Sequence, residues 1–441
     1  MSRKGGGMRA VMRHVVFAAL ITIPISTKAQ SRIDIAEARR YFEELHQLGE
    51  LDGGKLWGAR VDGPLFFVDP QSFELVANMP DSAGQWKEQN GVWIGQLSKD
   101  QSPANTAIQW AGRKWSMVMW PVSDDRYVRG RLLIHESFHR IQPQLRFSTG
   151  NPSNAHLAAA EGRIWTRLEE RALVEALLRN GAARRQALTD ALTFRARRQS
   201  LFPSAAQEEN MLEMNEGLAE YTGYRLSGLP VSALPDRIAA RLSNAEAQDS
   251  YSRSFAYATG PAYAVLLDAT GKSWRKNLSD KSNLSVLTAK MYGISGIDPT
   301  TADSRTVRYA ATRMIVEERA RETQRLAKEA KWRTMLVDGP TVTVPVGSNF
   351  NYSFDPNGVS PLDIGSVYET ARITDEWGIL AVSNGAVLMR RSNGLITAVV
   401  VPAPAGDSAP VKGNGWELSV AAGWSLQPGA RKGDWILQRN K

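Results

Sequence analysis

Two histidines and a glutamate stand close together in the segment Leu132–Arg140, where His135, Glu136 and His139 form a His-Glu-x-x-His pattern. The periodicity of this segment predicts a helix, and a helix turns by about 100° per residue. His135 and His139 therefore project from one face about one turn apart, a spacing that lets two imidazoles bind one metal ion. Glu136 lies beside them, where its carboxylate can take a proton from a water on that metal.

The helix that carries this pattern needs clear ends and two packed sides. Ser123 or Asp124 is expected to cap its N-terminus, and Pro143 is expected to end it. Apolar side chains follow two stripes along the segment, and the two histidines lie on one of them. This pattern predicts a helix that is buried on two sides, as the central helix of an active site would be.

A third protein ligand for the metal is expected to be a carboxylate. The chain contains no Cys, which excludes thiolate zinc sites, disulfides and a cysteine nucleophile. Glu216 shares a predicted helical face with small residues, where a metal ion can approach, and its sequence context is the more specific of two candidates. The other candidate is Glu161, which lies on the next predicted helix after the His-Glu-x-x-His helix.

Two further side chains have possible roles at such a site. Glu220 follows Glu216 by one helical turn on the same face, where it can orient a ligand histidine through the free N–H of the ring. Tyr257 can donate its hydroxyl to the oxyanion of a tetrahedral intermediate. A tyrosine that is packed in the core with a satisfied hydroxyl explains Tyr257 equally well.

These residues resemble the gluzincin metallopeptidases, which combine His-Glu-x-x-His with a glutamate ligand from a later helix. The segment 215–219, Asn-Glu-Gly-x-Ala, is similar to the catalytic domains of the aminopeptidase N and glycyl aminopeptidase families. Glu220 stands where the thermolysin pattern has aspartate. The segment 257–260, Tyr-Ala-Thr-Gly, is similar to the Tyr-x-Lys-Gly motif of those aminopeptidase families.

The resemblance implies one zinc ion (Zn²⁺) per chain with three protein ligands, which are His135, His139 and Glu216. It also implies that Glu136 is the general base of the reaction. Tyr257 corresponds to the tyrosine that stabilises the transition state in those families. The implied activity is the hydrolysis of peptide bonds.

The resemblance further implies a zincin-like fold. An antiparallel sheet would lie over the zinc cleft, and its edge strand, expected at Trp115–Trp120, would align a peptide.

The chain differs from the families in three respects. The long gap between His139 and Glu216 implies a helical insertion near 155–200, and Thr259 stands in place of the motif lysine. The Gly-x-Met-Glu-Asn motif is absent, which argues against an aminopeptidase.

Residues 1–29 have the pattern of a secretory signal peptide. Basic residues precede an apolar run from Val15 to Ile25, which is too short to span a membrane. Small residues then precede an expected cut before Gln30. The mature chain is therefore expected to have no membrane span and to lie in a bacterial periplasm or outside the cell.

The rest of the chain is expected to be an α+β protein of two domains. A zincin-like metallopeptidase domain is expected over 30–335, β-rich over 60–122 and helical over 123–335. An all-β, sandwich-like domain is expected over 336–441. Asn-Gly steps between apolar runs favour hairpin turns because both residues tolerate positive φ. Two hairpin turns are therefore predicted in the second domain, at Asn384-Gly385 and Asn393-Gly394.

The formal net charge of +9 gives little reason to expect a nucleic-acid partner. Five of the Lys and Arg residues lie in the predicted signal peptide, and its removal leaves +4. Arginines over 163–198 alternate with acidic residues, which is typical of a solvated helical surface. The expected partner is a peptide or protein substrate.

The sequence thus favours an exported zinc metallopeptidase with Glu136 as general base. The alternative is a non-catalytic envelope-binding protein, in which the helical domain is structural and the C-terminal β domain binds a ligand. The metal content of the purified protein separates the two hypotheses.

Overall fold

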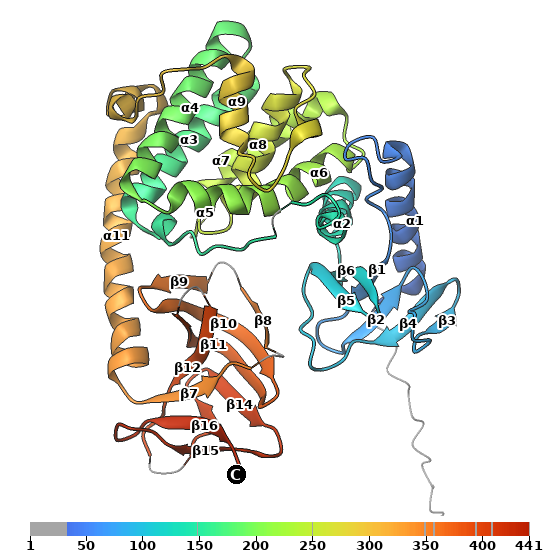
Figure 1. Ribbon diagram of the computed structural model, residues 1–441, viewed down its shortest axis with the longest axis vertical. Coiled ribbons are helices and arrows are strands. Elements are labelled where there is room, and N and C mark those ends of the chain that lie inside the picture. Colours follow the sequence, from blue (N-terminus) through green and yellow to red (C-terminus); the bar gives the residue numbers. More distant parts are fainter. Residues whose placement is uncertain are drawn as a thin grey trace, which may run out of the picture. The chain divides into compact units, whose positions relative to one another are not determined.

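Two mixed β-sheets, with a large set of helices between them in sequence, make up the fold (Figure 1). The α+β class expected from the sequence is therefore confirmed. The computed structural model describes residues 33–440, apart from 148, 249, 348–349, 356–357, 393–394 and 407–408. The predicted signal peptide at 1–29 lies outside the described residues.

The N-terminal sheet follows helix α1 (Ile35–Asp52) and has the strand order β3-β4-β2-β1-β6-β5. Its strands are β1 (Leu65–Val68), β2 (Glu74–Ala77), β3 (Lys87–Gln89), β4 (Val92–Gln96), β5 (Thr106–Trp110) and β6 (Arg113–Met119). β1 and β6 run parallel, and the other neighbouring pairs are antiparallel. The prediction of a wholly antiparallel sheet is wrong at this one pair, because β6 returns beside β1 instead of extending the row of hairpins.

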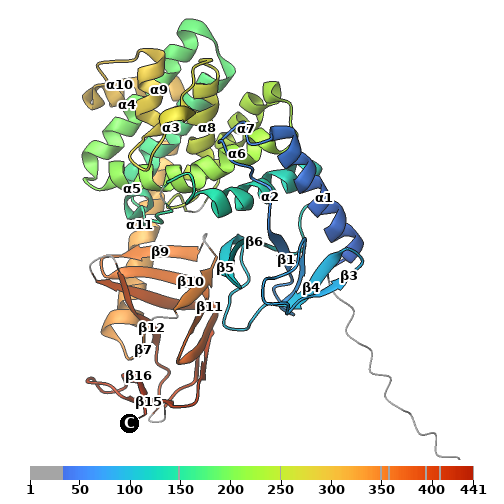
Figure 2. The same ribbon diagram turned by 45° about the vertical axis from the view of Figure 1, so that its right-hand side comes forward.

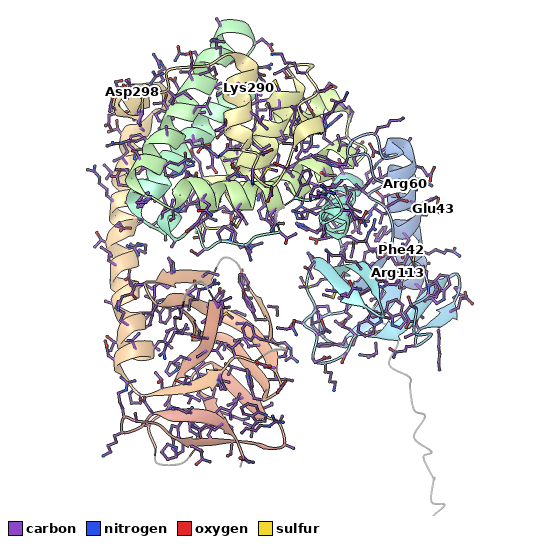
Figure 3. All side chains as sticks on the ribbon, in the orientation of Figure 1. Phe42, Glu43, Arg60, Arg113, Lys290 and Asp298 are labelled. Carbon is purple, nitrogen blue, oxygen red and sulfur yellow. The ribbon has the colours of Figure 1, made fainter. Side chains whose placement is uncertain are left out.

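The central strand β1 is covered on both faces, and all four of its residues are fully buried. Phe67 faces α1, where its ring stacks on Phe42 with 4.9 Å between the centroids. Phe66 faces a second apolar cluster, in which it contacts Trp86. Figure 3 labels Phe42 beside Glu43, the exposed residue that follows it on α1. A continuous apolar run is what a strand buried on both faces requires.

The helices form the middle part of the chain, within the segment 123–335 that the sequence predicts to be helical. They are α2 (Arg126–Ile141), α3 (Ala160–Leu178), α4 (Gly181–Leu201), α5 (Ala205–Leu212), α6 (Leu218–Leu226), α7 (Leu234–Ala245), α8 (Ala256–Asp268), α9 (Leu284–Tyr292), α10 (Ala302–Arg305) and α11 (Ala311–Arg333). A π-helical turn at Glu213–Gly217 joins α5 to α6. Both views place α2 between the N-terminal sheet and α6 (Figures 1 and 2). Over the described part of the chain, no helix is long and apolar enough to cross a membrane.

A buried network of charged side chains joins α3, α4, α5 and the π turn. Arg195 pairs with Glu169 at 2.7 Å and with Glu213 at 2.5 Å. Arg198 pairs with Glu169 at 2.7 Å and with Glu209 at 2.5 Å. All five side chains are almost inaccessible to solvent. Each arginine presents several N–H donors in a planar fork, and this lets one guanidinium serve two carboxylates.

The expected solvated surface over 163–198 is therefore wrong for part of that segment. Four of its arginines are buried, namely Arg163, Arg167, Arg195 and Arg198. These four arginines form ion pairs with carboxylates of neighbouring helices and of the π turn. Because the partners come from different helices, the periodicity of one segment could not reveal them.

The C-terminal part of the chain forms the second sheet, a single hydrogen-bonded network of strands. Its strands are β7 (Thr341–Pro345), β8 (Asn351–Phe354), β9 (Val359–Leu362), β10 (Gly365–Asp375), β11 (Gly378–Ser392), β12 (Leu395–Pro402), β13 (Lys412–Gly413), β14 (Trp416–Val420), β15 (Trp424–Pro428) and β16 (Trp435–Arg439). Leu380 and Val399 belong to the main core of this sheet. Trp332, near the end of α11, packs in a separate cluster with Leu388 and Val400.

The hairpin turn predicted at Asn384-Gly385 is wrong, because β11 continues through both residues as one strand. Asn384 has a φ of 66°, and the register between β10 and β11 shifts at this point. The positive φ therefore forms a bulge, which bends a strand without reversing it. The step at 393–394 lies outside the described residues. Ser392 and Leu395 pair antiparallel on either side of it.

Candidate metal centre

Helix α2 holds both candidate histidines between the N-terminal sheet and the other helices. Asp125 caps its N-terminus, since its carboxylate accepts the backbone N–H groups of Tyr127 and Val128 at 2.8 and 3.0 Å. The predicted cap at Ser123 or Asp124 is therefore too early. Apolar side chains of α2 are buried on two sides of the helix, as expected, and include Leu133, Ile134, Phe138 and Ile141.

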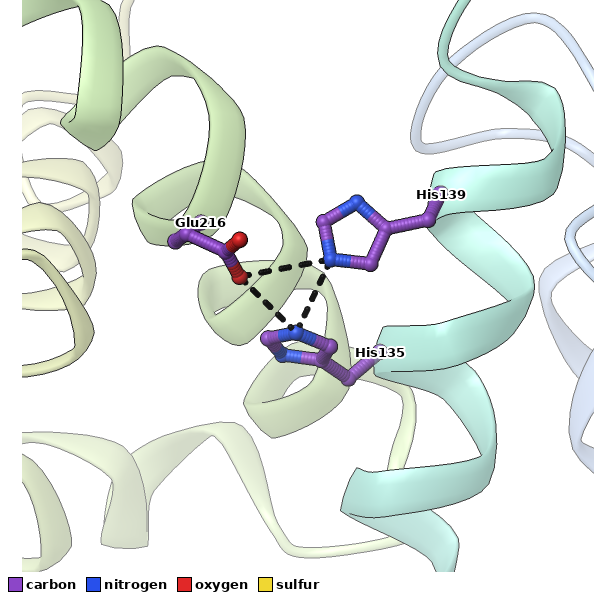
Figure 4. A group of neighbouring side chains, drawn as sticks. All are labelled: His135, His139 and Glu216. Atoms are coloured by element: carbon purple, nitrogen blue, oxygen red, sulfur yellow. Dashed lines mark hydrogen bonds and ion pairs between the residues drawn. The ribbon is translucent and has the colours of Figure 1, made fainter. Parts of the chain in front are cut away.

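His135, His139 and Glu216 converge in space (Figure 4). The Nε2 atoms of the two histidines are 3.1 Å apart. Glu216 Oε2 lies 3.4 Å from each of these two nitrogen atoms. One ligand atom from each residue lies within 4.8 Å of the others, so the group can hold a metal ion.

The other ring nitrogen of each histidine has an acceptor partner. His135 Nδ1 lies 3.0 Å from Glu220 Oε2, and His139 Nδ1 lies 2.9 Å from Gln142 Oε1. An acceptor at Nδ1 favours the tautomer in which Nδ1 carries the proton and Nε2 presents a lone pair. Two lone pairs and a carboxylate oxygen then face one another, an arrangement that could hold a cation.

The charges at this cluster favour a cation. Burial by itself lowers the pKa of His135, but the carboxylates of Glu216 and Glu220 outweigh it and raise this pKa to about 10. Burial by itself raises the pKa of Glu216, but His135 and His139 hold it well below its usual range. A site that stabilises an imidazolium beside a carboxylate also suits a metal ion held by neutral imidazoles and that carboxylate.

Glu216 reaches the histidines because α8 crosses the π turn at very close range. A Cβ atom on Gly260 would lie 2.4 Å from the Cα of Gly217, so only glycine fits at this crossing. The crossing brings Arg253 and Tyr257 to the carboxylate of Glu216. Arg253 Nη2 donates to its Oε1 at 2.8 Å, and the Tyr257 hydroxyl donates to its Oε2 at 2.5 Å.

Tyr257 lies at the cluster itself and not in a separate part of the core. Its ring stacks on that of His135, with 5.6 Å between the centroids and 5° between the planes. Burial, with the nearby charge of Glu216, raises the pKa of Tyr257 well above its usual value. The hydroxyl therefore keeps its proton and remains a hydrogen-bond donor.

Glu136 lies next to the histidines in the same cavity. Only 5% of its surface is exposed, and its Oε2 has no hydrogen-bond partner among the described residues. Burial raises its pKa, and the charges of His135 and His139 oppose this shift. Its backbone carbonyl accepts the Ser116 hydroxyl at 3.1 Å, which ties α2 to β6. A carboxylate on the lining of a cavity is well placed to act on a water or a substrate.

The cavity that holds these groups has a volume of about 380 Å³ and is lined largely by polar side chains. Residues 105–107, at and just before β5, form one wall of it, and Lys114 from β6 contributes to the lining. β5 is the edge strand of the sheet, whereas β6 pairs on both sides. The expected edge strand at Trp115–Trp120 is therefore wrong. Among the described residues β5 is the outer strand at this end of the sheet, and it contributes to the cavity wall.

Glu161, the rival third ligand, lies elsewhere. It is exposed and accepts a hydrogen bond from Trp165 Nε1 at 3.0 Å. It is not part of the cluster that can hold a metal ion. His156 is likewise remote from the cluster, since its Nε2 lies 2.8 Å from Glu209 in the buried charge network.

Three side chains at this site were not found from the sequence, namely Lys114, Gln142 and Arg253. Arg253 precedes Tyr257 by four positions, and this spacing was the signal that could have placed Arg253 at the site. No sequence motif marks Arg253. Gln142 follows His139 by three positions, near enough for a side chain at a helix end to reach the ring. Lys114 lies on β6, which is separate in sequence from the helices that carry the metal ligands. Its position at the site depends on how the strands of the sheet pair.

Substitution of Glu220 by glutamine is expected to weaken metal binding by about 10- to 100-fold, because the carboxylate orients His135 and makes it a better donor. A chelator competition titration measures this change. Glu161→Gln is the matched control, since it makes the same chemical change at an exposed glutamate outside the cluster. Equal metal affinity of the two variants would contradict this role of Glu220.

Comparisons with known proteins give no relative of this chain. No family model, curated protein or solved structure matches it. Its function must therefore be inferred from the side chains of the site, their distances and their burial.

Proposed function

We propose that the protein is a zinc-dependent metallopeptidase of the gluzincin type, which hydrolyses peptide bonds. The observation that carries this proposal is the convergence of His135, His139 and Glu216, with Glu136 lining the same cavity. Two imidazoles, one carboxylate ligand and one adjacent carboxylate base are the set of groups that this chemistry needs.

Zinc suits this donor set. Catalytic zinc sites use three protein ligands of nitrogen, sulfur or carboxylate type and keep a fourth position for water. Donors about 2.0–2.2 Å from a tetrahedral ion lie about 3.3–3.6 Å from one another. The observed separations of 3.1 and 3.4 Å among the ligand atoms of His135, His139 and Glu216 are close to this range.

The side chains around the cluster have separate tasks in this proposal. When bound, zinc lowers the pKa of its water towards neutrality and polarises the scissile carbonyl. Glu136 accepts the proton of the attacking water and passes it to the leaving amine. Tyr257 is a protonated donor beside the cluster. On substrate binding its hydroxyl would turn from Glu216 Oε2 to the carbonyl oxygen, whose developing negative charge it would stabilise. Glu220 and Gln142 hold the two histidine rings in place.

A zincin-like arrangement is part of the same proposal. Among the described residues β5 is the outer strand beside the cavity, where an extended peptide can add to the sheet by backbone hydrogen bonds. The proposal retains export to the periplasm or the medium, which rests on the predicted signal peptide at 1–29. The C-terminal sheet would bind a substrate, a surface or a partner.

Metal analysis and peptide hydrolysis together test this function. Purified protein is expected to contain about one zinc per chain and to cleave peptides, and a chelator is expected to abolish cleavage until zinc is restored. His135→Ala is expected to lose both the metal and the activity. Protein that folds, contains no zinc and gains no activity with added zinc would refute the proposal and favour a non-catalytic binding protein.

A further inference from the structure

Lys114 is a cation without a counter-ion on the wall of the proposed catalytic cavity. It lines the same cavity as His135, Glu136 and Glu216, and no carboxylate among the described residues pairs with it. Burial and the nearby Arg140 lower its pKa, so its surroundings disfavour the charge. A partly buried ammonium beside another cation has a cost in free energy, which an anionic ligand can offset.

Arg253 is a second cation on the wall of this cavity. It donates to Glu216 Oε1 at 2.8 Å and contacts Asn151. When zinc is bound, the two histidine ligands are neutral. The positive charges of Lys114, Arg253 and the zinc ion then exceed the negative charges of Glu136 and Glu216. The loaded cavity therefore carries net positive charge, which attracts an anionic group.

The packing of β6 on α2 sets the distance between Lys114 and the site of the proposed hydrolysis. The hydroxyl of Ser116 donates to the backbone carbonyl of Glu136, which places this point of β6 against α2 at the residue proposed as general base. Lys114 precedes Ser116 by two positions and lies on the same face of β6. Two residues of a strand span about 7 Å, so Lys114 is placed to reach a group one or two peptide residues from the bond that Glu136 serves.

We propose that the peptide substrate carries a carboxylate one or two residues from the scissile bond and that Lys114 binds this carboxylate, an inference that rests on the proposed peptidase function. The cavity of about 380 Å³ lies within the range of ligand pockets, roughly 300–1,000 Å³, so it has room for a short peptide segment beside Lys114. Every unmodified peptide has a terminal carboxylate, so we take this group as the ligand of Lys114. The protein then removes one or two residues from the carboxyl end.

Three sets of randomised tetrapeptides distinguish the sources of the carboxylate, with products identified by mass spectrometry. The first set has a free terminal carboxylate and no acidic side chain, the second is the same set amidated, and the third is amidated with one aspartate or glutamate. The zinc-loaded wild type is expected to cleave the first set and to release one or two residues from the carboxyl end. Cleavage of the third set but not the second assigns the carboxylate to an acidic side chain.

The variant Lys114→Met tests the assigned contact. It is expected to raise KM for the first set by about 10- to 100-fold, the worth of a charged hydrogen bond, and to leave kcat nearly unchanged. Lys87→Met is the matched control, because Lys87 is an exposed lysine on β3 of the same sheet. Calorimetric titration of the Glu136→Gln protein with the best free-acid tetrapeptide, with and without Lys114→Met, gives the same comparison without turnover.

The outcomes separate this inference from the proposed function. Equal cleavage of the free-acid and amidated sets, or an equal loss for both sets in Lys114→Met, would overturn the inference and leave a zinc peptidase in place. Absence of zinc and of cleavage in every set would overturn the function and the inference together. A KM increase restricted to carboxylate-bearing peptides supports Lys114 as the residue that determines specificity.

Discussion

Replacement of Glu136 by glutamine is expected to lower kcat/KM for peptide hydrolysis by about 10²- to 10⁴-fold while one metal ion per chain stays bound. Glutamine has nearly the same shape as glutamate but cannot accept the proton of the attacking water. Glu136 is not among the three residues whose ligand atoms converge, so the metal site is expected to persist. Hydrolysis assays combined with metal analysis of the same preparation measure both effects.

The surroundings of Glu136 allow this variant to separate a loss of catalysis from a loss of folding stability. Its Oε2 has no partner among the described residues, so the substitution breaks no hydrogen bond of that atom. The variant should therefore fold with nearly unchanged stability, which a denaturant titration verifies. Glu161→Gln again serves as the control with full activity expected. A Glu136→Gln protein as active as the wild type would rule out general-base catalysis by this residue.

The local part of the site could be predicted from the sequence because helical geometry fixes it. A spacing of four residues puts His135 and His139 on one face, whatever the rest of the chain does. The same rule placed Glu220 one turn from Glu216, and Glu220 lies 3.0 Å from a ring nitrogen of His135. The π turn at Glu213–Gly217 locally departs from this spacing, and no feature of the sequence predicted it.

The features of the fold and of the site that the sequence did not predict depend on which helices and strands pack together. The parallel pairing of β1 with β6 makes β5 the edge strand, and a pattern of alternating residues cannot reveal this order. Arg253 reaches Glu216 because Gly217 and Gly260 allow α8 to touch the π turn. At Asn384 the sequence specified a positive φ, but tertiary pairing decided that it forms a bulge and not a turn.

The substitution Arg198→Met is expected to lower the free energy of unfolding by about 3–5 kcal/mol. Arg198 is fully buried and pairs with Glu209 at 2.5 Å and with Glu169 at 2.7 Å. Methionine fills much of the same volume but leaves two buried carboxylates with one cation fewer. Urea unfolding measures the change. Arg179→Met is the control, since Arg179 and its partner Glu175 are exposed and such pairs contribute about 1 kcal/mol or less.

The pH dependence of the free energy of unfolding gives a second measurement for Arg198→Met. A packing defect alone would not change this pH dependence. Burial by itself raises the pKa of Glu209, but Arg198 and His156 hold it well below its usual range. A carboxyl group whose pKa is depressed by folding stabilises the protein above its unfolded pKa of about 4.3, and this contribution is lost as the pH falls through the lower folded value. The wild type is therefore expected to lose stability on acidification, and Arg198→Met to lose less over the same pH interval. Parallel acid profiles for the two proteins would show that Arg198 does not hold Glu209 in its charged form.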